Sequence, residues 1–149
     1  MKKYMLEALK EAKKADQVGE VPIGAVIVKD DKIIGRGHNL TETLKDPTKH
    51  AEMVAIEQAL KNTDGFRLKD CQMYVTLEPC SMCAGAIVLT RINKLYIGAM
   101  DPKSGACGSV LNVLQQEKLN HYVEIESKVY EEQCSAILKE FFHKLRLAK

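Results

Sequence analysis

The sequence has no hydrophobic run long enough to cross a bilayer. Its longest apolar run lies around residues 84–89, whereas a membrane-spanning helix needs about 20 apolar residues. Residues 1–7 become polar again within a few positions and lack the apolar core of a signal peptide. We therefore expect a cytoplasmic protein with no membrane partner.

The sequence also lacks a strong charge and an even number of cysteines. A formal net charge of +2 is too small to indicate a nucleic-acid partner, so an RNA-binding surface would have to come from local clustering of charges. The five cysteines argue against a disulfide framework. In a reducing compartment they would be free thiols or metal ligands.

No internal repeat, low-complexity tract or long linker divides the chain. Its 149 residues suit one compact domain, and an apolar fraction of 46% is ordinary for a globular protein. The sequence therefore predicts a single domain over residues 1–149.

The spacing of apolar residues predicts the order of helices and strands. Helical periodicity predicts helices over residues 4–15, 50–61, 80–90, 110–116 and 129–145. Apolar segments bounded by polar turns predict strands over residues 24–29, 32–38, 72–78, 94–100 and 122–127. Asp30 and Asp31 form a tight turn between the first two strands. The helix over residues 80–90 is apolar nearly all round, so we expect it to be buried on most faces. This order predicts an α/β fold with helices on both faces of a mixed sheet.

Three soft metal ligands and one carboxylate form the most informative pattern in the sequence. His50 and Glu52 lie two residues apart, and Cys80 and Cys83 lie three apart directly after Pro79. The cysteine spacing places both thiols on one face of a helix, whose positive end favours thiolates. His50 and Glu52 can reach one site only if their helix begins close to His50. Three ligands with an open fourth position are typical of a catalytic zinc site.

These residue types predict hydrolytic chemistry with one zinc ion per subunit. Zinc held by His50, Cys80 and Cys83 would lower the pKa of a water toward about 7. Glu52 is not needed as a ligand. We therefore expect it to take a proton from that water as general base and to return protons to the substrate as general acid. The His-x-Glu and Pro-Cys-x-x-Cys pattern resembles that of zinc-dependent base deaminases, which implies a nucleobase as substrate and ammonia as leaving group.

A closed structural zinc site is the main alternative interpretation of this pattern. Such a site would need a fourth protein ligand. The remaining candidates are Cys71, Cys107, Cys134, His38 and His121. None of them has motif spacing, and each is more typical of a small core residue or a surface side chain.

Several longer blocks resemble the bacterial tRNA-specific adenosine deaminase family (TadA) of the cytidine and deoxycytidylate deaminase superfamily. The His-x-Glu and Pro-Cys-x-x-Cys motifs specify only the superfamily. The blocks that narrow the resemblance cover residues 19–26, 38–39, 46–52, 74–87, 98–109 and 141–146. The resemblance implies a cytidine-deaminase-like three-layer α/β/α fold with a five-stranded mixed sheet. It also implies a homodimer that converts the wobble adenosine of a tRNA anticodon stem-loop to inosine.

The same resemblance implies a set of substrate-binding residues. Asn39 would hydrogen-bond the flipped base, and Val21, Pro22 and Ala51 would contribute to its pocket. The alternative role of Asn39 is that of a turn residue after a strand, where asparagines are common. Family members often carry a tryptophan before this asparagine, whereas this chain has His38 there and no tryptophan.

Asp101 and Lys103 lie in a glycine-rich loop that resembles the RNA-contacting loop of the family. A carboxylate accepts a hydrogen bond from the ribose 2′-hydroxyl, which distinguishes RNA from DNA. Our hypothesis is that Asp101 selects ribose. The alternative interpretation is a simple Asp-Pro turn.

The C-terminal segment is a second candidate RNA contact. It carries Phe142, His143, Lys144 and Arg146. Because Phe141 and Phe142 are adjacent, a helix cannot bury both equally, and an exposed ring can stack on a base. The cationic side chains can contact the RNA backbone. The alternative is a solvated basic helix end that suits the helix dipole.

Two rival functions share parts of these patterns. A zinc deaminase of a free base or nucleotide, such as guanine or cytidine, has the same metal chemistry but does not need a basic tail. A non-catalytic zinc-stabilised RNA-binding module would leave Glu52 without a role, because a structural metal needs no free acid beside it.

Overall fold

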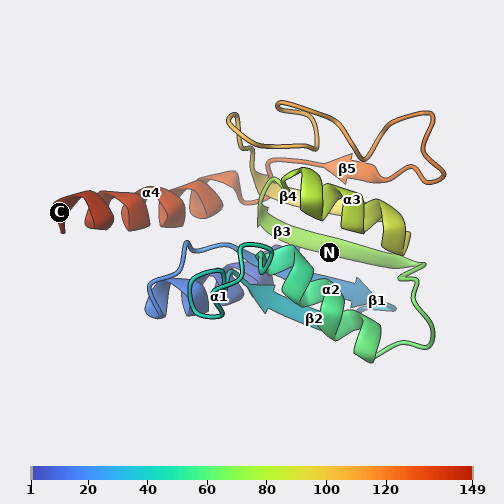
Figure 1. The fold of residues 1–149 in the computed structure, drawn as a ribbon, viewed down its shortest axis with the longest axis horizontal. Coiled ribbons are helices and arrows are strands. Elements are labelled where there is room, and N and C mark those ends of the chain that lie inside the picture. The colour runs from blue at the N-terminus through green and yellow to red at the C-terminus, as the bar shows by residue number, and fades with distance from the viewer. Residues whose placement is uncertain (1, 149) are drawn as a thin grey trace.

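The computed structural model describes residues 2–148 and contains four helices and five strands in this range (Figure 1). The helices are α1 (Lys3–Gln17), α2 (Ala51–Lys61), α3 (Ser81–Thr90) and α4 (Glu131–Leu147). The strands are β1 (Gly24–Lys29), β2 (Lys32–His38), β3 (Cys71–Leu77), β4 (Lys94–Ala99) and β5 (Glu124–Glu126). Within the described residues, no helix combines the length and the apolar character that a membrane span requires.

The strands form one mixed sheet in the order β2-β1-β3-β4-β5. β1 pairs antiparallel with both β2 and β3, whereas β3, β4 and β5 run parallel. The β1–β2 hairpin has a two-residue turn at Asp30 and Asp31, with φ angles of 50° and 61°. These angles are those of a type I′ turn, whose twist matches that of the strands. The structure thus confirms the predicted turn and the mixed sheet.

Alternate residues of the central strands pack into two separate cores. Ile27 and Met73 lie in the core that α2 and α3 cover. Their neighbours Val26 and Tyr74 lie in the core that α1 and α4 contact. This alternation follows from the pleat of a strand, which points successive side chains to opposite faces. The predicted three-layer α/β/α architecture is therefore confirmed.

Gly37 in β2 fixes the start of α2 against the sheet. A Cβ atom at this position would overlap the carbonyl oxygen of Ala51 and the amide nitrogen of Ala55. Only glycine permits this close approach. The approach matters for function because the first turn of α2 carries Glu52.

The prediction of a short helix over residues 110–116 is wrong. Cys107 and Asn112 form an isolated antiparallel bridge instead, and the Val113 amide donates to the Ala106 carbonyl at 2.8 Å. Backbone groups of this segment thus pair with the preceding loop and not with one another. The irregular turn buries Leu114 in the core.

The prediction that α3 is buried on most faces is also wrong. Leu89 is 69% exposed, and Met82, Gly85 and Ala86 are partly exposed. The sheet covers only one side of this helix, so its apolar composition does not lead to burial all round. α3 therefore presents an apolar surface to its surroundings.

The last strand and the last helix are confirmed, with shifted ends. β5 is shorter than expected. α4 begins after Tyr130, whose left-handed backbone, with a φ of 54°, prevents the helix from starting earlier. Within α4, Cys134 alone is fully buried. Figure 1 shows that α4 extends beyond the end of the sheet, which leaves its C-terminal half accessible.

Candidate active site

Two helix starts bring the predicted metal ligands together. His50 occupies the N-cap of α2 and Cys80 the N-cap of α3, both with extended backbone angles. Cys83 lies in the first turn of α3 and is buried. This arrangement confirms the expectation that the helix carrying Glu52 begins close to His50.

The three side chains converge with the spacing of zinc ligands. The His50 Nδ1 atom lies 3.5 Å from the Cys80 Sγ atom and 3.6 Å from the Cys83 Sγ atom. Tetrahedral zinc has bonds of about 2.3 Å to sulfur and about 2.0–2.1 Å to nitrogen, which separate these atoms by roughly 3.5 Å. All three ligand atoms lie within 4.8 Å of one another. The cluster therefore fits a tetrahedral metal ion of soft preference.

Hydrogen bonding within the cluster favours the thiolate form of Cys80. Hydrogen bonds with Cys83 and His50 lower the pKa of the Cys80 thiol to about 3. The hydrogen bond with Cys80 and burial raise the pKa of Cys83, and the hydrogen bond to Cys80 raises the pKa of His50. The thiolate is the form of cysteine that binds a metal.

Glu52 lies beside this cluster without belonging to it. It is 4% exposed in the first turn of α2, and burial raises the pKa of its carboxyl to about 7. Among the described residues, the metal-ligand cluster contains only His50, Cys80 and Cys83. A carboxyl group in this position is available for proton transfer.

None of the other cysteines and histidines completes a closed site. Cys71 and Cys134 are buried at other places in the sheet and in α4. His38 contacts Glu11 at 3.2 Å, and the His121 Nε2 atom lies 2.6 Å from the Ile92 carbonyl oxygen. The thiol of Cys107 lies near the Pro79 carbonyl, at 3.9 Å, and outside the cluster. In the described part of the chain, the fourth position of the cluster has no protein ligand.

A small pocket opens onto the cluster. Its volume is about 150 Å³, and its walls are formed by Ile23, His50, Glu52, Leu77, Glu78, Cys80, Asp101 and Ser104. Sites for drug-sized ligands have roughly 300–1,000 Å³. This pocket therefore suits one small group, such as a single base.

Of the predicted substrate residues, only Asp101 lines this pocket, and the others are neighbours of lining residues in the chain or through a hydrogen bond. Asp101 lines it directly. Asn39 is 6% exposed, its backbone amide donates to the Ile23 carbonyl at 3.1 Å, and Ile23 lines the pocket. Val21 and Pro22, which precede Ile23, do not line it, and Ala51 is fully buried between His50 and Glu52.

Asp101 also has the structural role that was the alternative to ribose selection: it stabilises a turn. Its carboxylate accepts hydrogen bonds from the amides of Lys103 and Ser104, at 3.0 and 3.3 Å, and from the Ser104 hydroxyl at 2.8 Å. The side chain is partly exposed. It therefore holds the loop and faces the pocket at the same time.

Two buried glutamates without a predicted role each hold a loop, and the loop held by Glu78 contributes Asp101 and Ser104 to the pocket. Glu20 accepts hydrogen bonds from the loop at Thr43, and Glu78 accepts them from the loop over residues 101–109. The available signal for Glu78 was an acidic residue directly after a mostly apolar strand, β3.

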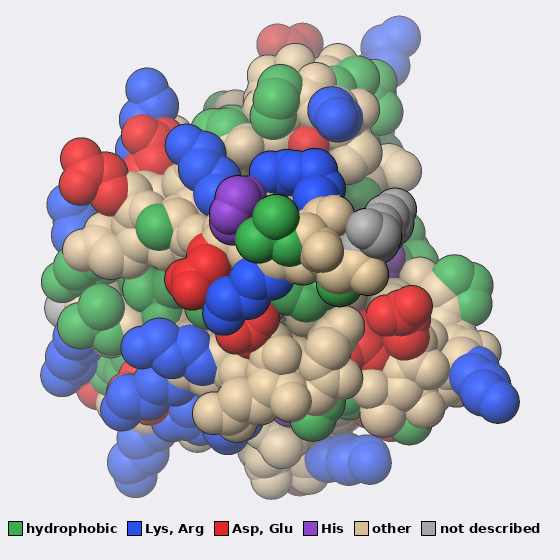
Figure 2. All heavy atoms as spheres, turned by 90° about the vertical axis from the view of Figure 1, so that its left-hand side faces the viewer, with side chains coloured by type: hydrophobic (Ala, Val, Ile, Leu, Met, Phe, Trp, Pro, Cys, Tyr) green, Lys and Arg blue, Asp and Glu red, His purple; other side chains and the backbone are tan. Residues whose placement is uncertain are grey.

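The C-terminal half of α4 borders a groove next to the pocket. The groove has a volume of about 600 Å³, and its walls include Leu77, Lys103, Phe142, Leu145 and Arg146. Phe142 is 41% exposed whereas Phe141 is partly buried, as the sequence predicted. Figure 2 views the end of the molecule toward which α4 points, and lysine and arginine side chains gather on this face beside a histidine. His143 and Lys144 are exposed on α4 but do not line the groove.

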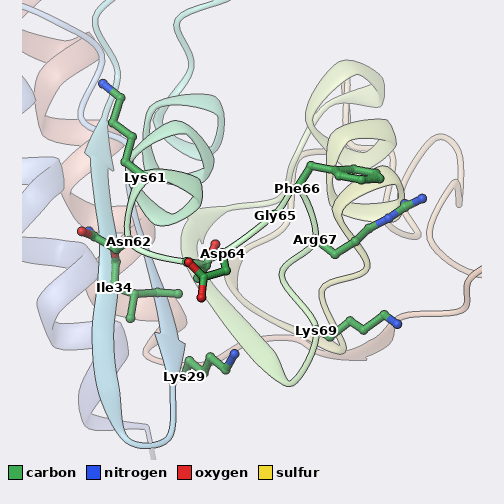
Figure 3. Close-up of a pocket in the computed structure, with 10 residues that line it drawn as sticks. Lys29, Ile34, Lys61, Asn62, Asp64, Gly65, Phe66, Arg67 and Lys69 are labelled. Carbon is green, nitrogen blue, oxygen red and sulfur yellow. The ribbon is translucent and has the colours of Figure 1, made fainter.

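A larger open pocket lies away from the metal-ligand cluster (Figure 3). It has a volume of about 830 Å³ and lies between the end of α2, β1 and the loop before β3. Arg67 extends alongside the Phe66 ring there, and its guanidinium donates to the Leu89 carbonyl at 2.6 Å. This arginine is thus engaged at the end of α3. The pocket contains none of the predicted metal, catalytic or substrate residues.

Comparisons with known proteins agree with this geometry. A family model described as MafB19-like deaminase matches residues 1–146. A tRNA-specific adenosine deaminase of Bacillus subtilis is 53% identical over 146 residues, which cover 98% of this chain and 91% of the relative. The chain belongs to the tRNA-specific adenosine deaminase family.

Solved structures also resemble this deaminase. One comes from a study of A-to-I editing by tRNA:A34 deaminases at the wobble position of transfer RNA. It is 43% identical, with a TM-score of 0.87, over 91% of this chain and 99% of that chain. A guanine deaminase from Bacillus subtilis is 40% identical, with a TM-score of 0.63, over 66% of this chain and 63% of that chain. The family resemblance and the cytidine-deaminase-like fold are thereby confirmed.

Proposed function

We propose that the protein converts the wobble adenosine of a tRNA anticodon to inosine by hydrolytic deamination. One observation carries the proposal: a buried carboxyl, Glu52, stands beside a three-ligand cluster in a chain that resembles tRNA-specific adenosine deaminases over 98% of its length. The geometry supports the chemistry, and the relatives support the substrate.

His50, Cys80 and Cys83 would hold one zinc ion per subunit. When bound, zinc supplies a water whose pKa is lowered to about 7. Glu52 would accept two protons in turn, first from the attacking water and then from the hydroxyl group formed on C6, and would pass one to the adenine ring nitrogen N1 and one to the leaving amine. The water oxygen thus becomes the C6 oxygen of inosine, the C6–N6 bond breaks, and ammonia leaves.

The flipped adenine would lie in the small pocket above Glu52. The side-chain amide of Asn39 has no hydrogen bond within residues 2–148, which leaves its donors and acceptor available to a base. Val21 and Pro22 directly precede the pocket-lining Ile23, whose amide donates to the Val21 carbonyl at 2.8 Å, and Ala51 lies between His50 and Glu52 in the chain.

The ribose and the RNA backbone would lie on the neighbouring loop and on α4. Asp101 would accept a hydrogen bond from the ribose 2′-hydroxyl at the rim of the pocket, and Lys103 would contact a phosphate. Phe142 offers a stacking surface in the groove, while His143, Lys144 and Arg146 contribute positive charge. Comparing the rates of an Asp101→Asn variant on RNA and DNA hairpins of the same sequence tests the ribose contact.

A homodimer would cover the exposed side of α3. Met82, Gly85, Ala86 and Leu89 form this apolar side, and a Cβ atom at Gly85 would meet nothing within 4 Å. Contiguous apolar surface on a soluble domain marks an interaction site. Two copies related by a two-fold axis would bury this apolar surface against each other.

The remaining expectations follow from the substrate. A tRNA substrate supports a cytoplasmic location. The single sheet, with helices from both halves of the chain on its faces, supports one catalytic domain over residues 1–149.

A direct assay separates this function from its rivals. The zinc-loaded protein should release ammonia from an anticodon stem-loop that contains the wobble adenosine, and not from free adenosine, cytidine or guanine. Release from free guanine would favour a guanine deaminase, as in the partial likeness to the Bacillus subtilis enzyme. Binding of the stem-loop without ammonia release would indicate a non-catalytic RNA-binding module.

A further inference from the structure

Glu78 is a buried carboxylate at the junction of the metal-ligand segment and the loop over residues 101–109. It is 3% exposed and lies two residues before Cys80. It also lines the pocket together with Glu52 and Asp101. The proposed mechanism gives this acid no task.

Four hydrogen bonds tie the Glu78 carboxylate to the loop. Its Oε1 atom accepts from the Asp101 amide at 2.9 Å and from the Ser109 hydroxyl. Its Oε2 atom accepts from the amides of Cys107 and Ser109, each at 3.0 Å. All four partners are donors, which matches the acceptor-only chemistry of a carboxylate. The loop is therefore built around this one anion.

Two further contacts show that the loop and the carboxylate fit each other closely. A Cβ atom at Gly105 would overlap the Glu78 carboxylate, so glycine is needed for the loop to wrap around it. The Ala106 amide donates to the Pro79 carbonyl at 2.9 Å. The segment that ends in Cys80 thus fixes the loop at two successive residues.

We propose that Glu78 is a positioning residue for substrate recognition: its carboxylate fixes the loop over residues 101–109 and holds Asp101 at the rim of the pocket. The proposal rests on the proposed function, because it assigns Asp101 and its loop to the RNA substrate. Residues 78–80 would then have two separate roles. Cys80 serves the metal, and Glu78 serves the substrate loop.

Glu78→Gln is the sharpest variant because it keeps the shape of the side chain. Its amide group must face one pair of donors. At the Oε1 position the Ser109 hydroxyl can rotate to accept, so the Asp101 amide loses its acceptor. Glu20→Gln is the matched control, since Glu20 is a buried carboxylate that holds the other loop, at Thr43.

Hydrogen exchange of the zinc-loaded protein tests the hold on the loop without measuring activity. Glu78→Gln should accelerate amide exchange in residues 101–109 by about tenfold. Amide exchange in residues 40–48, the loop that contains Thr43, should not change. Glu20→Gln should give the reverse pattern. Unchanged exchange in residues 101–109 would overturn the proposal, whether or not the protein deaminates tRNA.

Steady-state kinetics on the anticodon stem-loop tests the role in recognition. Glu78→Gln should raise KM about tenfold, change kcat by less than about threefold, and retain one zinc per chain. In an Asp101→Asn background the same change should raise KM by less than about threefold, because both changes disrupt one interaction. As the control, Glu20→Gln should have the same effect on KM in the wild-type and the Asp101→Asn backgrounds.

Two outcomes of these kinetics overturn the positioning role. One is an equal effect of Glu78→Gln in both backgrounds, and the other is loss of zinc from that variant. Should Glu78→Gln fail to fold, Ser109→Ala decides the question, since it removes one donor and leaves the carboxylate. It should raise KM about threefold to fivefold and accelerate exchange in residues 101–109, and the absence of both effects sinks the proposal. Failure of the proposed function would show differently, as a wild-type protein that does not deaminate the stem-loop.

Discussion

His50 and Cys80 occupy the same position in two different helices, the N-cap, and their Nδ1 and Sγ atoms lie 3.5 Å apart. The positive ends of α2 and α3 therefore point at the same place, which favours thiolate over thiol and a water that loses its proton. Glu52 enters this region from the first turn of α2.

Replacement of Glu52 by glutamine should remove catalysis and spare the metal. The variant keeps the shape of the side chain but cannot accept the proton, so kcat should fall by about 10²- to 10⁴-fold. Inosine formation on the stem-loop and zinc content by elemental analysis check this. Glu57→Gln, an exposed glutamate on the same helix, should retain activity. A zinc-loaded Glu52→Gln protein with more than about a tenth of the wild-type rate would contradict the assignment.

Removal of the metal should inactivate and destabilise the protein together. The ion binds the folded cluster and stabilises the native state by mass action, so a chelator should lower Tm and activity, and one equivalent of zinc should restore both. Cys80→Ser should lose zinc. Cys71→Ser, at the start of β3 and outside the cluster, should keep one zinc per chain. Equal zinc content in the two variants would show that the cluster is not the metal site.

Charge reversal on α4 should weaken RNA binding. Replacing Lys144 and Arg146 by glutamate should lower the affinity for the stem-loop at least about tenfold and reduce the slope of log affinity against log salt by about two. Lys61→Glu with Lys69→Glu changes the total charge equally in the pocket of Figure 3. Titrations at several salt concentrations compare the two pairs. The same loss for both would show that net charge, and not α4, determines binding.

A charge on the exposed side of α3 should prevent dimerisation. Leu89→Glu would place an unpaired carboxylate inside an apolar interface, which costs several kcal/mol, so light scattering should report the mass of one chain. Leu6→Glu, on α1 at the opposite face of the sheet, should leave the mass of two chains. A Leu89→Glu protein that still has the mass of two chains would place the interface elsewhere.

Glu20 should contribute stability at neutral pH and lose it in acid. Burial raises the pKa of this carboxyl, but hydrogen bonds from Thr43 and Glu42 outweigh it and leave the pKa below its ordinary value. A lowered pKa in the folded state gives stability that is present above the unfolded-state pKa and is lost as pH falls through the folded-state pKa.

Thermal unfolding of Glu20→Gln between pH 7 and pH 3 checks this expectation. At pH 7 the variant should be less stable than the wild type by about 1–3 kcal/mol, the cost of leaving buried donors without an acceptor. The difference should shrink as the pH falls. Glu42→Gln, the exposed neighbour, should show no such change. A difference that stays constant over this range would contradict the assignment.

Apart from the helix expected over residues 110–116, the order of the elements and the identity of the metal-ligand cluster could be predicted from local sequence. Strands, helices and the Asp30–Asp31 turn depend on local periodicity and backbone preference, which the sequence displays directly. The cluster was predictable because His50 and Cys80 each lie at a helix start that the motifs specify. The spacing of Glu52 from His50 even required the α2 start that the structure has.

The roles of the loops and of the exposed helix faces could not be predicted in this way. The turn around Asn112, the exposed side of α3 and the hold of Glu78 on the loop at Asp101 all depend on partners distant in sequence. Glu78 and Asp101 are 23 residues apart, and Glu78 and Ser109 are 31 apart. Hydrogen bonds of this kind follow no sequence period, because the sheet brings their partners together only after the chain has folded.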